Sequence, residues 1–282
     1  MEKDNIIIPN KEEFEKKKGI FIETGKENFH IISDFDRTLT KAFAENEEKH
    51  SSFSWIRENE YLGPKYTKEA YRLFEIYYPL EISPELSQEE KNSKMNEWWE
   101  KHIQLFIDNG LNKEIIEKTI KENDIELRNN CKRLIQTLEK ENIPLLILSA
   151  GLGDVIKGFL EKEKIMNNKI HIISNFFEFD KDEKAVGYKS KIIHTFNKNE
   201  SSVKNTPYYE EIKTRKNVIL LGDNLGDLMM SEGIDHNSII RVGFLNENEE
   251  KLLEQFKDNF DVIILNDGPM DFVNDLVKEI IN

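Results

Sequence analysis

Asp34 and Asp36 close a short apolar segment and are separated by a single residue, Phe35. Side chains alternate between the two faces of a strand, so both carboxylates would point to the same side. One carboxylate can attack phosphorus to form an acyl phosphate, while the other, kept protonated by its surroundings, gives a proton to the departing oxygen. The alternative is a turn after a strand in which Asp and Thr side chains cap the next element. For an isolated pair of aspartates this alternative is the preferred interpretation.

A second acidic pair, Asp223 and Asp227, follows another apolar segment in the sequence GDNLGD. Carboxylate oxygens suit Mg²⁺, which usually keeps several waters and binds a few carboxylates together with the phosphate of a substrate. Asp223 can share such an ion with Asp34. The alternative is that Asp223 caps the helix that follows, because Gly-Asp after a strand is a common turn.

Groups that bind phosphate are also present. Ser149 ends a third apolar segment, and its hydroxyl can bind phosphate oxygens together with the backbone amides of Ala150 and Gly151. A lysine is needed to balance the negative charge. The chain between Ser149 and Asp223 offers three candidates, Lys189, Lys191 and Lys198. Their spacing does not choose among them, and the default for each is a solvated surface charge.

The chemical groups follow short apolar segments that predict β-strands. Strands are predicted at residues 30–36, 143–149, 170–174, 218–222, 239–243 and 262–265. Helical or polar segments separate most of them, and this alternation predicts a parallel sheet covered on both faces. The predicted fold class is therefore α/β. In an open sheet of this kind, ligands bind at the carboxyl ends of the strands, where the acidic motifs lie.

Residues 46–128 interrupt this pattern with apolar and aromatic residues at helical spacing and little strand signal. We therefore predict a helical cap over 46–128, inserted after the first catalytic strand, and a catalytic core made of 29–45 and 129–282. Because the insert leaves and returns at the carboxyl ends of neighbouring strands, it can cover a site there. Residues 1–28 predict a charged N-terminal helical leader.

Composition and charge restrict the partners. The chain has 40 Lys and Arg against 54 Asp and Glu, a net charge of −14, which opposes binding to nucleic-acid polymers and anionic membranes. A small phosphate ester held by local positive charge remains compatible with this balance. Cys131 is the only cysteine, so no intramolecular disulfide can form, and no stretch approaches a membrane span. We expect a cytoplasmic protein, whose oligomeric state the sequence does not indicate.

The motifs Asp-x-Asp-x-Thr, Ser, Lys and Gly-Asp-x-x-x-Asp, in this order along an α/β chain, resemble those of the haloacid dehalogenase superfamily. Asp36 fits its phosphatases, because the dehalogenases lack that acid. A more specific resemblance, over about residues 30–270, is to the cytosolic 5′-nucleotidases of type III, the pyrimidine 5′-nucleotidases. The segments that carry it are SDFDRTLT, LEISPELSQEEK, NEWW, LSAGLGDVI, ISNFFEFD, IHTFNK and ILLGDNLGDLMM.

This resemblance implies a Rossmann-like haloacid dehalogenase core with a helical cap. It also implies Mg²⁺-dependent hydrolysis of nucleoside 5′-monophosphates, pyrimidine ones such as CMP and UMP above all. Asp34 would be the nucleophile and Asp36 the general acid and base. Mg²⁺ would be held by Asp34, Asp223 and the backbone carbonyl of Asp36, with Asp227 in support. The phosphate would be bound by Ser149, Ala150 and Lys198, the last of which lies in the FNK segment where the family has its lysine.

The resemblance also implies a site for the base. Glu81, in the LEISP segment, would accept a hydrogen bond from the base, and Trp98 or Trp99, where the family has Trp-Tyr, would contribute an aromatic surface. The alternatives are an exposed charge for Glu81 and cap-core packing for the tryptophans. Two departures leave the base preference open. His102 stands where the family has a substrate-contacting serine, and the segment near Ser54 lacks an expected histidine.

Two rival functions follow from the same observations. One is a phosphatase of the same fold that acts on another small phosphomonoester, such as phosphoserine or 7-methyl-GMP. The other is a non-catalytic nucleotide-binding module, against which the complete set of Asp34, Asp36, Lys198 and Asp223 argues. A panel of substrates distinguishes a nucleotidase from the first rival, and magnesium-dependent phosphate release distinguishes an enzyme from the second.

Overall fold

The computed structural model describes residues 5–44, 47–48, 51–83, 85–122, 125–199, 203–204 and 206–282. A central seven-stranded sheet has the order β1-β11-β10-β9-β2-β5-β6. Its strands are β1 (Ile6–Ile7), β2 (Phe29–Ser33), β5 (Leu145–Leu152), β6 (Ile170–Asn175), β9 (Asn217–Gly222), β10 (Ser238–Leu245) and β11 (Val262–Leu265). All neighbours pair in parallel except β1, which pairs antiparallel with β11. The predicted α/β class with a parallel sheet is confirmed.

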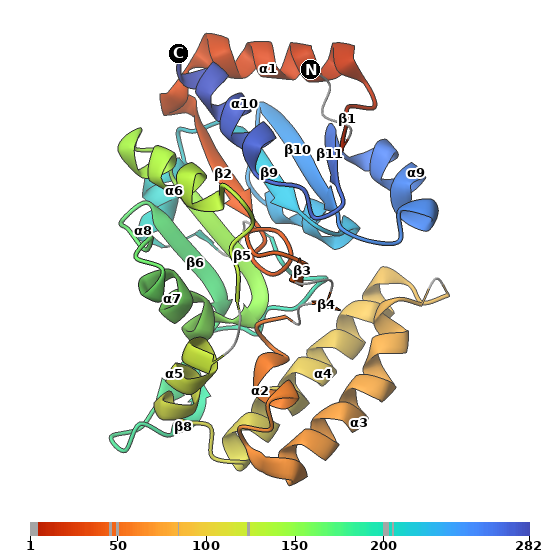
Figure 1. The fold of residues 1–282 in the computed structure, drawn as a ribbon, viewed down its shortest axis with the longest axis vertical. Coiled ribbons are helices and arrows are strands. Elements are labelled where there is room, and N and C mark those ends of the chain that lie inside the picture. Colours follow the sequence, from red (N-terminus) through yellow and green to blue (C-terminus); the bar gives the residue numbers. More distant parts are fainter. Residues whose placement is uncertain are drawn as a thin grey trace.

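Alternating apolar residues bury both faces of the sheet. In β2, Ile31 packs in one apolar cluster and Ile32 in the other, and Ile219 and Leu220 divide in the same way in β9. Helices α1 (Lys11–Thr24), α6 (Cys131–Lys140), α7 (Gly153–Lys162) and α10 (Asp271–Ile281) cover the first face. Helices α8 (Pro207–Ile212), η3 (Leu225–Ser231) and α9 (Glu249–Asn259) cover the second. The result is a three-layer core (Figure 1).

The N-terminal segment forms β1 and helix α1, which lies across one end of the sheet in Figure 1. Asn10 caps α1 by accepting a hydrogen bond from the backbone N–H of Glu13, and Gly25, with a φ of 74°, follows its last turn. Phe14 and Phe21 are buried against the core. Helix α1 is therefore packed on the core, and the short helix η1 (Lys26–Asn28) joins it to β2.

A helical layer lies at the carboxyl ends of the central strands, with α3 and α4 side by side in Figure 1. It contains α2 (Trp55–Glu58), α3 (Gly63–Glu81) and α4 (Gln88–Asp108), which together with residues 51–54 are called the cap below. Helix α5 (Lys113–Glu122), within the range predicted for the cap, instead lies against α7 of the core (Figure 1), where the Lys162 ammonium donates to the backbone carbonyl of Ile120. Ser87 and Glu90 form a capping box at the start of α4. Tyr66 and Phe106 stack between α3 and α4, their ring centroids 5.3 Å apart. These contacts make α3 and α4 one packed pair.

Two small hairpins complete the described chain, β3 (Phe43–Ala44) with β4 (Glu47–Glu48), and β7 (Phe177–Phe179) with β8 (Ala185–Tyr188). The ring of Phe177 lies 5.9 Å from that of Phe106, which joins the second hairpin to the cap.

Among the described residues, no helix combines the length and apolar character that a bilayer crossing requires.

Candidate active site

Three of the predicted motifs meet where the parallel strands end. Asp34 follows β2, Ser149 lies in the second half of β5, and Asp223 follows β9. The strand over 30–36 is shorter than predicted, because β2 ends at Ser33. Below the cap these residues border a cavity of about 760 Å³, a size typical of small-molecule sites. Its walls include Asp34, Asp36, Glu81, Trp98, Trp99, His102, Ser149, Ala150, Lys198 and Asp223.

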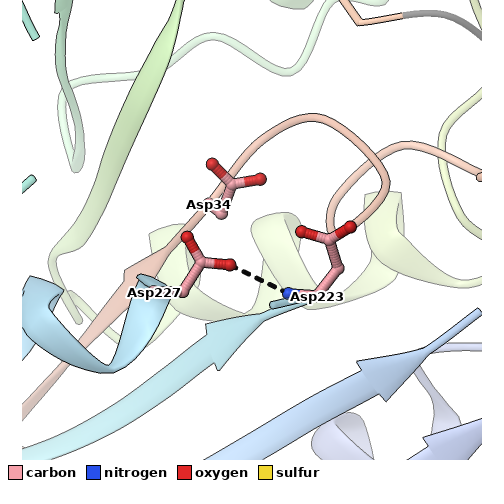
Figure 2. A group of neighbouring side chains, drawn as sticks. All are labelled: Asp34, Asp223 and Asp227. Carbon is pink, nitrogen blue, oxygen red and sulfur yellow. Dashed lines mark hydrogen bonds between the residues drawn. The ribbon is translucent and has the colours of Figure 1, made fainter. Parts of the chain in front are cut away.

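Asp34, Asp223 and Asp227 form a compact acidic group (Figure 2). One carboxylate oxygen from each lies within 4.8 Å of the others. Within the described ranges this is the one group of three or more His, Cys, Asp or Glu side chains placed to hold a metal ion. Carboxylate oxygens are the type of ligand that Mg²⁺ takes in proteins. The Asp36 carboxylate is not part of this group and accepts hydrogen bonds from Ser52 instead.

Asp227 holds the turn that carries Asp223. Its Oδ2 accepts hydrogen bonds from the backbone N–H groups of Asp223 at 3.0 Å and Asn224 at 3.2 Å. The first of these is the dashed line in Figure 2. A Cβ at position 222 would lie 2.5 Å from the Cβ of Asp227, so Gly222 leaves the space that this side chain needs. The sequence motif thus builds the turn as well as supplying the acids.

Lys198 lines the cavity, whereas Lys189 and Lys191 do not. The Lys198 ammonium donates to Oδ1 of Asp34 at 2.5 Å and to Oδ1 of Asp227 at 3.1 Å. Burial lowers the pKa of Lys198, but the Asp227 and Asp34 carboxylates outweigh burial and raise that pKa above its ordinary value. The lysine therefore stays protonated and supplies local positive charge within an acidic protein.

The acidic group is crowded as well as buried. Burial raises the pKa of Asp34 well above its ordinary value; Lys198 opposes the rise, and the charges of Asp227 and Asp223 add to it. Burial also raises the pKa of Asp223 to about 6, again with a contribution from Asp227. Because these carboxylates repel one another in a poorly solvated place, a cation bound among them would be stabilised.

The Asp36 carboxylate is held by Ser52, a residue that no sequence motif indicated. Its Oδ1 accepts from the backbone N–H of Ser52 at 2.9 Å, and its Oδ2 accepts from the Ser52 hydroxyl at 2.7 Å. Burial raises the pKa of Asp36, and the two hydrogen bonds from Ser52 oppose that rise. Nothing in the local sequence SSFS marks Ser52 as a partner of Asp36.

The irregular end of β5, where the pairing with β6 shifts register after Leu148, is held by hydrogen bonds beside the acidic group. The Ser149 hydroxyl accepts a hydrogen bond from the backbone N–H of Gly151 at 3.0 Å. The backbone carbonyl of Ala150 accepts from Nδ2 of Asn175 at 2.8 Å and from Nε1 of Trp99 at 3.1 Å. Asn175 was not predicted from the sequence either, although it lies in the ISNFFEFD segment that carried the family resemblance.

Glu81 lies at the cap side of the cavity and accepts a hydrogen bond at 2.7 Å from the hydroxyl of Thr195 in the core. Burial raises its pKa, against the opposing effects of Thr195 and Lys198. The interpretation of Glu81 as an exposed charge is therefore wrong. Thr195 is a third residue that sequence reasoning missed, and it lies in the IHTFNK segment.

Both Trp98 and Trp99 line the cavity, although adjacent helical residues point in different directions. The Trp98 ring stacks on that of Tyr77 at 5.9 Å between centroids, and the two indoles meet edge to face at 4.9 Å. Trp99 is fixed by its hydrogen bond to Ala150. The pair therefore forms a rigid aromatic wall that also belongs to the cap core.

His102 lines the cavity but is only 2% exposed. Its Nε2 lies 3.0 Å from the Tyr66 hydroxyl, and its ring packs edge to face on Phe53. Burial, with a smaller effect of the nearby Arg57, lowers the pKa of His102 to about 3. His102 is therefore a neutral member of the cap's aromatic core.

A family model described as "Pyrimidine 5′-nucleotidase (UMPH-1)" matches residues 37–281, most of the chain and most of the site just described. The chain belongs to the pyrimidine 5′-nucleotidase (UMPH-1) family. It is therefore a 5′-nucleotidase, a hydrolase of phosphomonoesters, as the motifs predicted.

Relatives and solved structures agree with this membership. The chain is 36% identical over 277 residues to the 7-methylguanosine phosphate-specific 5′-nucleotidase A of Xenopus laevis, covering 98% of this chain and 96% of the relative. It is 35% identical to the human 7-methylguanosine phosphate-specific 5′-nucleotidase, covering 93% and 88%. A crystal structure of cytosolic 5′-nucleotidase IIIB bound to cytidine superposes with a TM-score of 0.88 at 30% identity, covering 99% and 94%.

A substrate-bound phosphoserine phosphatase shares the fold at 16% identity, with a TM-score of 0.53 over 88% of this chain and 97% of that one. The predicted haloacid dehalogenase fold is confirmed by these neighbours.

Proposed function

We propose that this 5′-nucleotidase hydrolyses nucleoside 5′-monophosphates, pyrimidine ones such as CMP and UMP first, through an aspartyl-phosphate intermediate on Asp34. The observation that carries the proposal is the position of Lys198. Its ammonium joins Asp34 to Asp227 and lines the same cavity as Glu81 and Trp98. The lysine suits a phosphate, and the carboxylate and the indole suit a base.

In the first step the Asp34 carboxylate attacks phosphorus while Lys198 binds the phosphate oxygens. The P–O bond to the nucleoside breaks, and Asp36 gives its proton to the 5′ oxygen. In the second step a water molecule attacks the phosphorus, its proton passes to Asp36, and the Asp34–phosphorus bond breaks. Ser149 and the backbone of Ala150 would hold the phosphate through both steps.

Asp34, Asp223 and the backbone carbonyl of Asp36 would hold Mg²⁺, with Asp227 ordering the turn. The site fits such an ion, because the carboxylate oxygens of the buried Asp34 and the half-buried Asp223 lie close together and the pKa of each is raised. A bound Mg²⁺ would neutralise phosphate charge and orient the attack. Without a cation, the bare carboxylates would repel the phosphate of the substrate.

The cap, within the predicted range of residues 46–128, would close over the core of residues 29–45 and 129–282. Three hydrogen bonds already join the two parts around the cavity: Ser52 to Asp36, Trp99 to Ala150, and Thr195 to Glu81. Closure excludes water, which strengthens the electrostatic interactions at the phosphate.

The base would stack beside the indoles and donate a hydrogen bond to Glu81 from the exocyclic amine of cytosine or N3–H of uracil. 7-Methyl-GMP is the second candidate, favoured by the names of the Xenopus laevis and human relatives. Its guanine carries a positive charge from the N7 methyl group, which suits a carboxylate and aromatic faces. We also propose a cytoplasmic location, supported by a Caenorhabditis elegans relative named "Putative cytosolic 5'-nucleotidase 3".

The test is phosphate release from CMP, UMP, dTMP, AMP, GMP, 7-methyl-GMP and phosphoserine, each with and without Mg²⁺. We expect Mg²⁺-dependent release, fastest from CMP or UMP. A preference for 7-methyl-GMP would select the second candidate. Release from phosphoserine alone would reject nucleotide hydrolysis, and binding without any release would indicate a non-catalytic module.

A further inference from the structure

Ser52 contacts the Asp36 carboxylate through two donors at once. Its backbone N–H reaches Oδ1 at 2.9 Å and its hydroxyl reaches Oδ2 at 2.7 Å. Two contacts to one planar group fix both its position and the rotation of its plane. Ser52 is completely buried, so water does not compete for either hydrogen bond.

The hydroxyl of Ser52 occupies a space that Gly151, near the end of β5, leaves open. A Cβ at position 151 would lie 2.0 Å from Ser52 Oγ and 3.2 Å from Oδ2 of Asp36. The absence of a side chain at Gly151 is therefore what allows Ser52 to approach Asp36. The same end of β5 carries Ser149, so the contact joins the cap, the carboxylate of Asp36 and the part of β5 that we propose binds phosphate.

Each oxygen of the Asp36 carboxylate retains a lone pair when Ser52 donates to it, because a carboxylate oxygen accepts two hydrogen bonds. When Asp36 gives its proton to the leaving 5′ oxygen, negative charge develops on the carboxylate. The two Ser52 donors already face that charge and need no reorganisation, a condition that favours the transition state.

We propose that Ser52 is a positioning residue, through which the cap holds the carboxyl group of Asp36 in the orientation for proton transfer to the leaving nucleoside. This inference rests on the proposed function and adds to it a residue outside every motif of the family resemblance. Nucleotide that binds with the cap displaced would meet an Asp36 without its two donors. Closure of the cap therefore brings the two Ser52 donors to the Asp36 carboxylate that acts as general acid.

The test compares two substrates that differ in one atom. One is CMP, or whichever nucleotide the wild type prefers, and the other is its analogue with sulfur in place of the bridging 5′ oxygen. A thiolate leaves without protonation, so only the oxygen substrate needs the Asp36 proton. The quantity measured is kcat/KM, which reports the steps up to departure of the leaving group.

Ser52→Ala should lower kcat/KM for the oxygen substrate about ten- to a hundredfold, the effect of one hydrogen bond to a charged group. The loss on the sulfur substrate should be at least about fivefold smaller. Asp36→Asn is the reference variant: its kcat/KM should fall further for the oxygen substrate and, again, less for the sulfur substrate. Ser52→Thr keeps both donors and should retain the wild-type kcat/KM for the oxygen substrate. Thr67→Val is the matched control, because the Thr67 hydroxyl bonds within α3, to the backbone carbonyl of Gly63, and does not line the cavity, so this variant should keep the wild-type ratio.

Should Ser52→Ala fail to fold, Ser52→Cys keeps a side chain of similar shape with only a weak S–H donor and should give the same selective loss. Equal losses on both substrates in the variant that folds, or no loss on either, would overturn the role of Ser52 while leaving the proposed function intact. Failure of the proposed function is a separate result, namely a wild type that releases no phosphate from any nucleotide.

Discussion

His102 offers a quantitative test of how the cap is built. The imidazole is buried between α3 and α4, with the Tyr66 hydroxyl as its partner and the Arg57 guanidinium nearby. Burial and Arg57 lower the pKa of His102 from 6.5 to about 3, so the folded protein keeps this ring neutral. The unfolded chain has no such environment, and there the same ring takes up a proton as the pH falls through 6.5.

The sign of the effect follows from this difference. Because the unfolded state of the protein binds the proton more tightly, stability is highest above pH 6.5 and falls as the pH drops towards about 3. Each pH unit in that window costs about 1.4 kcal/mol. Between pH 6.5 and about pH 4.5, His102 alone should therefore lower the free energy of unfolding by about 3 kcal/mol.

The assay is urea unfolding of the wild type and of His102→Gln across this range, followed by tryptophan fluorescence. Glutamine keeps a neutral hydrogen-bonding group near Tyr66 but cannot be protonated. The variant should be less stable at about neutral pH, and the gap should close by about 3 kcal/mol at about pH 4.5. The buried carboxylates titrate in both proteins and cancel in the difference. Parallel stability curves for the two proteins would refute a neutral, buried His102.

Three further predictions concern the site. Asp34→Asn should abolish phosphate release with the fold retained by circular dichroism, because an amide does not form an acyl phosphate; turnover near the wild-type rate would exclude Asp34 as nucleophile. Asp223→Ala should raise the Mg²⁺ concentration for half-maximal activity or remove activity, whereas an unchanged Mg²⁺ titration would place the ion elsewhere. Glu81→Ala should lower kcat/KM for the preferred nucleotide about ten- to a hundredfold more than for a phosphate ester without a base. Equal losses on the two would assign Glu81 to cap structure.

The sequence alone determined the fold class and the acidic end of the site. Short apolar segments separated by helices are a local pattern, and in a parallel sheet their carboxyl ends share one edge. Residues that directly follow such segments therefore meet, and the order of the motifs, with the family resemblance, turned the separately weak signals of Asp34, Ser149 and Asp223 into one predicted site. The family segments then indicated Lys198 and Glu81, which both line one cavity.

Only the tertiary structure decided what these groups contact. Ser52, Thr195 and Asn175 have no motif of their own, because each acts through a partner brought close by the packing of the cap and the sheet. Thr195 and Glu81 are 114 residues apart in the chain. The sequence showed that His102 replaces a substrate-contacting serine of the family. The structure shows that this histidine is buried and neutral in the cap core. Hydrophobic periodicity specifies which face of an element is buried, whereas the pairing of polar groups across elements depends on the distances and the desolvation that the packed structure sets.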